Sequence, residues 1–98
     1  MIEGKTKAGF KFSIDERILG DWRLLSAIAL SDSKDQSEQI KGTHELVTLI
    51  LGDRERDLMD FIAKRNDGYV PADKVAETIT EILTSVKELK NSPSSEGL

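Results

Sequence analysis

The longest regular pattern of apolar and polar positions runs from Pro71 to Leu89. Apolar residues recur there at steps of three and four, which places them on one side of an α-helix, with charged residues opposite. The apolar positions are Val75, Ile79, Ile82, Leu83, Val86 and Leu89. Burying one such aliphatic side chain stabilises a fold by about 1.5–3 kcal/mol. We therefore expect most of this stripe to lie in the core.

Near the N-terminus the apolar pattern alternates instead. Phe10, Phe12 and Ile14 are separated by polar residues, which predicts a strand with one buried face. Ile2 can pair back onto this strand as a short hairpin. Because an isolated pair of strands is only marginally stable, we expect a helix to pack against it.

A first helix is predicted from Trp22 to about Leu30. Asp21 precedes it and is a suitable N-cap, because its carboxylate can accept a hydrogen bond from a free backbone amide. Its predicted apolar face consists of Trp22, Leu25, Ile28 and Ala29. We expect Trp22 to be buried on this face; the alternative is an exposed anchor for a partner.

A second helix is predicted to begin near Asp35 or Ser37 and to end at Gly52, a common C-terminal stop. Gly42 lies inside it and lowers its stability by about 1 kcal/mol relative to alanine. The predicted apolar stripe consists of Ile40, Thr43, Val47 and Ile50, widened by Leu46, Leu49 and Leu51.

Asp53 is predicted to cap a third helix, which ends at residues 66–68. Its apolar residues are Leu58, Met59, Phe61 and Ile62. Pro71 suits the first turn of the last helix, and residues 91–98 are small and polar, which predicts a flexible tail. The sequence thus predicts one domain, residues 1–90, with an α+β, mostly α fold: an N-terminal strand or short hairpin packed on about four helices.

Composition narrows the classes of partner. The chain has 98 residues, of which 38% are hydrophobic and 33% charged, with a formal net charge of -4; these values are typical of a soluble globular domain with one modest core. The acidic balance argues against nucleic acid, and the lysines of the N-terminal arm are too few for a phosphate-binding patch. The absence of cysteine excludes disulfides and fits the cytoplasm. No apolar run approaches the ~20 residues of a membrane span.

Candidate catalytic and metal-binding residues are sparse. His44 is the only histidine, so no second histidine can share a metal with it. Residues 32–37 are similar to the start of a calcium loop, but Lys34 replaces an oxygen ligand and Ser37 replaces the glycine. No phosphate-binding loop or nucleophile motif is present. We therefore expect no enzyme activity, no cofactor and no metal, and interpret the chain as an interaction domain.

Several short motifs follow one another in an order similar to that found in a known protein family. They are the strand at residues 9–15, Asp21 and Trp22 at a helix start, Leu51 and Gly52 before a charged helix, the turn at residues 67–70, and the serine-rich segment at residues 91–95. In this order and spacing the chain resembles the tail assembly chaperones of long-tailed (siphovirus-type) bacteriophages or prophages of Gram-positive bacteria. The resemblance covers nearly the whole chain.

The resemblance implies a protein of the bacterial host cytoplasm that coats and solubilises the tape measure protein, helps recruit tail tube protein and is absent from the mature virion. A coat works by repetition, so we also expect a homo-oligomer, formed through a strand edge or the apolar margins of helices. The candidate groove for the tape measure helix is formed by the outer apolar positions. These are Leu46, Leu49, Phe61 and Leu89. The alternative is a small phage or host regulatory or adaptor protein that binds one folded partner; an enzyme subunit is a more distant one.

Overall fold

The computed structural model describes residues 1–90 and the side chains of residues 1–88. The predicted tail at residues 91–98 and the side chain of Leu89 lie outside the described part. The elements follow the chain in the order β1 (Ile2–Lys5), β2 (Lys11–Ile14), the 3-10 helix η1 (Glu16–Gly20), α1 (Trp22–Ser31), α2 (Gln36–Leu51), the 3-10 turn η2 (Gly52–Arg54), α3 (Glu55–Lys64) and α4 (Ala72–Lys90). The predicted mostly helical α+β fold with an N-terminal hairpin is confirmed.

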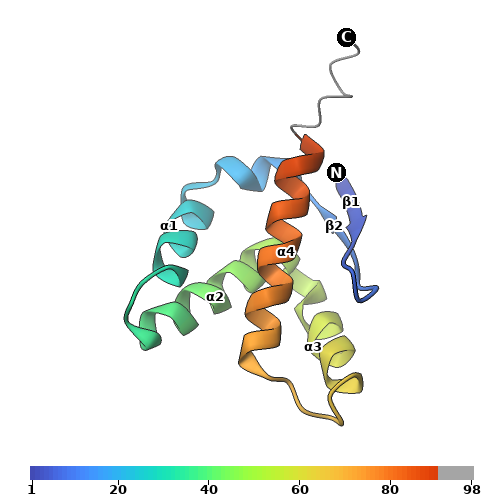
Figure 1. Ribbon diagram of the computed structural model, residues 1–98. Coiled ribbons are helices and arrows are strands. Elements are labelled where there is room, and N and C mark those ends of the chain that lie inside the picture. The colour runs from blue at the N-terminus through green and yellow to red at the C-terminus, as the bar shows by residue number, and fades with distance from the viewer. Residues whose placement is uncertain (91–98) are drawn as a thin grey trace.

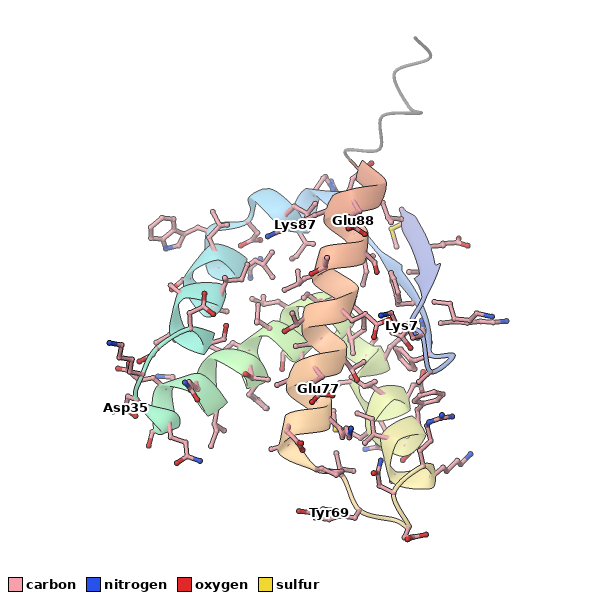
Figure 2. All side chains as sticks on the ribbon, in the orientation of Figure 1. Lys7, Asp35, Tyr69, Glu77, Lys87 and Glu88 are labelled. Atoms are coloured by element: carbon pink, nitrogen blue, oxygen red, sulfur yellow. The ribbon has the colours of Figure 1, made fainter. Side chains whose placement is uncertain are left out.

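The hairpin pairs β1 and β2 in antiparallel register, with Gly4 opposite Phe12. Phe12 faces the core, and a Cβ on Gly4 would lie 2.6 Å from its ring, so any other residue would displace this buried ring. The Thr6 hydroxyl closes the turn by accepting a hydrogen bond of 3.0 Å from the Phe10 amide. The Lys7 amide then donates a hydrogen bond of 2.7 Å to the carboxylate of Glu81 in α4. Figure 2 shows Lys7 beside this helix. The hairpin is thus held against α4, as its marginal stability requires.

Helix α4 crosses the centre of the molecule, with α1 on one side and α3 and the hairpin on the other, while α2 starts on the side of α1 and passes behind α4 (Figure 1). Its predicted stripe is buried at Ile79, Ile82, Leu83 and Val86, while Val75 is half-buried and packs against the core. The helix starts one residue after the predicted position, because the Pro71 carbonyl accepts the first hydrogen bonds, from the Lys74 and Val75 amides. None of the described helices is both long and apolar enough to cross a membrane.

The helices α1 and α2 start where the sequence predicts. Asp21 accepts a hydrogen bond of 2.8 Å from the Arg23 amide, and Asp35 accepts one of 2.8 Å from the Ser37 amide. The two helices pack closely, because a Cβ on Gly42 would lie 2.8 Å from the Ala27 carbonyl oxygen. Gly42 therefore has a packing reason that outweighs its poor helix propensity.

The predicted buried face of α1 is wrong except at Ile28, which is half-buried and packs against the core. Trp22 is 80% exposed and Leu25 is 48% exposed, whereas Leu24 and Ala27 are buried. The backbone of α1 at Ala27, Leu30 and Ser31 lies against Gly42 of α2, and this contact sets which side of α1 is covered. The helix therefore turns its Ala27 side inward, and the face with Trp22 lies in solvent.

The predicted cap of α3 is also wrong. Asp53 lies within η2, and Arg54 is the residue before α3, with no side-chain hydrogen bond to the helix start. Gly52 does end α2, with a positive φ of 53° that favours glycine. Within α3, Leu58 and Ile62 are buried in the shared core as predicted.

Candidate partner-binding groove

A groove of about 500 Å³ lies where α2, α3 and the start of α4 meet. In Figure 1 the N-terminal half of α4 runs between the other two helices. Its apolar lining residues are Ile40, Val47, Met59, Ala72, Val75 and Ala76. The exposure of these residues varies: Ile40 is 58% exposed, whereas Val47 is buried. The groove therefore has an apolar floor in the core and an apolar edge in solvent.

The spacing of the lining residues fits a helical partner. Helix α2 contributes Ile40, His44 and Val47, at steps of four and three, and α4 contributes Ala72 and Ala76, four residues apart. Such rows present one face of each helix along the groove. Alanines also let another backbone approach closely. An amphipathic helix with apolar residues at i, i+3, i+4 and i+7 is the kind of ligand that grooves between helices accept.

The polar residues at the groove give it an acidic character. They are Gln36, Gln39, Thr43, His44, Glu55 and Asp73. Glu55 and Asp73 each lie in the first turn of a helix, where the dipole favours a carboxylate. The Glu55 carboxylate accepts a hydrogen bond of 3.3 Å from the Thr48 hydroxyl. No lysine or arginine is among the described lining residues.

A second hollow, of about 610 Å³, lies between the start of α1 and the C-terminal half of α2. Trp22 forms one wall, and Leu49 contributes apolar surface. Glu45 and Thr48 add polar groups, and His44 lines both this hollow and the groove.

Asp21 and Arg23 fix the backbone next to Trp22. The Arg23 guanidinium donates to both carboxylate oxygens of Asp21, at 3.1 and 2.8 Å. These side-chain hydrogen bonds, together with the Arg23 amide, lower the pKa of Asp21 to about 2. The same arrangement, with Arg17 as donor, lowers the pKa of Asp15 to about 2 at the start of η1. Both pairs are exposed and structural, because each carboxylate also accepts from the backbone amide two residues later.

The four residues that the sequence suggested for partner binding do not line one groove. Leu46 is 4% exposed and belongs to the core, so its assignment to the outer surface is wrong. Leu49 is half-buried in the hollow beside Trp22. Phe61 packs edge-on against Phe10, with ring centroids 5.5 Å apart. The side chain of Leu89 lies outside the described residues.

Phe61 is part of an aromatic and cationic cluster at the hairpin. Arg54 lies over the Phe10 ring at 5.3 Å and Arg65 lies over the Phe61 ring at 5.5 Å. Cation–π contacts contribute about 0.5–1 kcal/mol at exposed sites and more where the pair is shielded from water. The cluster attaches α3 to the hairpin.

Sequence reasoning missed Ile40, Met59 and Val75 as groove residues, because it assigned all three to the core. One sequence signal could have indicated that Ile40 is exposed: Ile40 is the first residue of the apolar stripe of α2 and lies close to the polar start of this helix. No sequence signal reports that α2, α3 and α4 meet, because their residues are far apart in the chain.

No group of three or more histidine, aspartate or glutamate side chains among the described residues could hold a metal ion, and the acidic residues of the groove lie at helix starts. The arrangement can bind an apolar surface and discriminate by charge. Comparisons of the chain with protein-family models, with curated proteins and with solved structures found no match.

Proposed function

We propose that this protein is a non-catalytic tail assembly chaperone of a long-tailed phage or prophage, which works in the host cytoplasm. It holds amphipathic helices of the tape measure protein in the groove between α2, α3 and α4 and helps to recruit tail tube protein. Two observations support the proposal: the sequence resemblance to this class of chaperone, and a groove whose lining rows suit a helix. The groove carries the proposal, because a chaperone of a long helix needs a surface of this shape.

The charge of the groove defines the segments that it prefers. Glu55 and Asp73 line it and no described lining residue is cationic, so a helix with lysine or arginine beside its apolar stripe gains favourable electrostatics. A helix with flanking glutamates is repelled. The chaperone is therefore selective for the basic amphipathic segments of its partner.

Peptide binding tests the proposal directly. A fluorescein-labelled amphipathic segment, taken from the tape measure protein of the same genome, is titrated with the protein and followed by fluorescence anisotropy. Ile40→Gln removes the exposed aliphatic edge of the groove. The loss of about 1.5 kcal/mol of binding free energy from apolar burial should raise Kd about ten-fold. A peptide whose flanking lysines are replaced by glutamates should bind more weakly to the unchanged protein.

Leu25→Gln is the matched control. Leu25 is also a partly exposed aliphatic residue of a helix, 48% exposed, but it does not line the groove. Its replacement should leave Kd unchanged. Failure of the unchanged protein to bind any tape measure segment, or equal weakening by both variants, would contradict the proposal.

Gene order separates this function from that of a regulator or adaptor. A chaperone gene should lie between the genes for the tail tube protein and for a very long coiled-coil protein. A repressor and an integrase as neighbours would favour the regulator.

A further inference from the structure

The hairpin and the adjacent side of α3 carry positive charges that the proposed function does not use. Lys5, Lys11, Arg54 and Arg65 form what we call the cationic surface. The hairpin and α3 lie on the same side of α4 (Figure 1), and none of the four residues lines the groove between α2, α3 and α4. In a chain whose net charge is -4, such a local excess of positive charge attracts anionic groups to one place.

The strand register brings two of these charges together. Lys5 of β1 is directly opposite Lys11 of β2, and both residues are exposed. Like charges at opposed positions destabilise a pair of strands, and neither lysine forms an ion pair with a described carboxylate. A carboxylate placed between the two ammonium groups would offset this repulsion, because it can accept a charge-assisted hydrogen bond from each of them.

Two arginines continue the surface onto α3. The Arg54 guanidinium lies over the Phe10 ring and the Arg65 guanidinium lies over the Phe61 ring. Because the two rings are in edge-on contact, both guanidiniums belong to one patch beside the hairpin. A guanidinium can stack on a ring and still donate through the N–H groups at its edge. Arg65 forms no ion pair with a described carboxylate, so its charge is available to a ligand.

The mixture of charges favours a peptide over a nucleic acid. Glu3 is exposed on β1 and Asp57 pairs with Arg54 at 3.4 Å, so two carboxylates lie among the four cations. A nucleic acid presents a phosphate at every step of its backbone and would meet both carboxylates. A peptide can place neutral residues opposite Glu3 and Asp57 and acidic residues opposite the cations. The surface therefore suits an acidic peptide segment.

We propose that the cationic surface binds a short acidic segment of a partner protein, with one carboxylate between Lys5 and Lys11 and a second carboxylate on Arg65. Ion pairs at an exposed surface are individually weak and are screened by salt. The binding is accordingly reversible and sensitive to ionic strength. It leaves the groove open, so one copy of the chain can hold a basic helix and an acidic segment at the same time.

A peptide titration tests this binding. The probe is a fluorescein-labelled peptide of alternating glutamate and serine, titrated with the full chain and followed by fluorescence anisotropy. We expect binding at low ionic strength that weakens at least ten-fold at about 0.15 M salt, where the Debye length is about 8 Å. The same peptide with glutamine in place of glutamate should not bind. No binding at low ionic strength, equal binding of the glutamine peptide, or tighter binding of a single-stranded DNA of equal charge would overturn the proposal.

Paired variants locate the contact. Lys11→Gln combined with Arg65→Gln should raise Kd for the acidic peptide about ten-fold, because two cations are lost. Lys34→Gln combined with Lys41→Gln is the matched control: it makes the same change in net charge at exposed positions outside the cationic surface, and should change Kd less than two-fold. Equal weakening by both double variants would reduce the effect to net charge and overturn the proposal.

Single variants separate this binding from stability and from the proposed function. Lys11→Gln removes the repulsion with Lys5, so the protein should be at least as stable in urea while it binds the acidic peptide about three-fold more weakly. Normal peptide binding by Lys11→Gln would contradict the proposed contact. Ile40→Gln alters only the groove and should bind the acidic peptide as the unchanged protein does, so failure of this proposal and failure of the proposed function are read independently.

Discussion

Replacing Gly42 by alanine tests the close packing of α1 on α2. Alanine in a helix interior is favoured over glycine by about 1 kcal/mol, so sequence reasoning predicts stabilisation. In the structure a Cβ at this position would lie 2.8 Å from the Ala27 carbonyl oxygen and from the Leu30 carbonyl carbon, and closer still to the Ser31 nitrogen. These are backbone atoms, which cannot rotate away, so the two helices must separate.

The magnitude follows from the two opposing effects. Overpacking of a core costs about 1–3 kcal/mol, and occasionally more, and rigid backbone contacts place Gly42→Ala at the upper end. After the gain in helix propensity is subtracted, we expect a net loss of about 2 kcal/mol in the free energy of unfolding. In a domain of this size that loss lowers Tm by roughly 10 °C.

Urea unfolding followed by circular dichroism measures this loss. Gly20→Ala is the matched control, because a Cβ on Gly20 meets no atom within 4 Å and its φ is not in the left-handed region. The control should change the free energy of unfolding by less than about 1 kcal/mol. If Gly42→Ala is as stable as the unchanged protein or more stable, α1 and α2 do not approach as closely as described, and the orientation of α1 loses its explanation.

Three further predictions concern the carboxylates and the core. Hydrogen bonds from Arg23 hold the pKa of Asp21 near 2, below its ordinary 3.8. The ionised Asp21 therefore stabilises the fold fully above about pH 4, and this contribution is lost as the pH falls through 2. An NMR titration should show this pKa, and Arg23→Gln should return it toward 3.8. Leu46→Ala should cost about 2–5 kcal/mol in urea unfolding and Leu49→Ala clearly less, because only Leu46 is fully in the core; equal losses would contradict the assigned burial. Asp35→Ala should cost about 1 kcal/mol by removing the cap of α2, and Asp35→Ser should retain most of the stability.

Local chemistry determines where most of the helices and strands of this protein begin and end. The stripe of α4, the alternation in β2, the caps Asp21 and Asp35 and the stop at Gly52 all depend on neighbours within a few residues. Such features can be read along the chain, because helix and strand periods and capping geometry are local properties. The predicted cap at Asp53 failed where the chain forms a 3-10 turn, η2, between two helices.

Which face of α1 is buried was decided only by tertiary packing. The helix has two apolar faces, one with Trp22 and Leu25 and one with Leu24 and Ala27, and the spacing of apolar residues led to a prediction of the wrong one. The backbone of α1 packs against Gly42 of α2 on the side of Ala27, so Ala27 is buried and Trp22 is left in water. The groove arises in the same way, because Ile40, a residue of α2, becomes part of a surface only when α3 and α4 pack beside it. Sequence patterns determine the elements of this protein, and contacts between distant segments determine which apolar residues remain available to a partner.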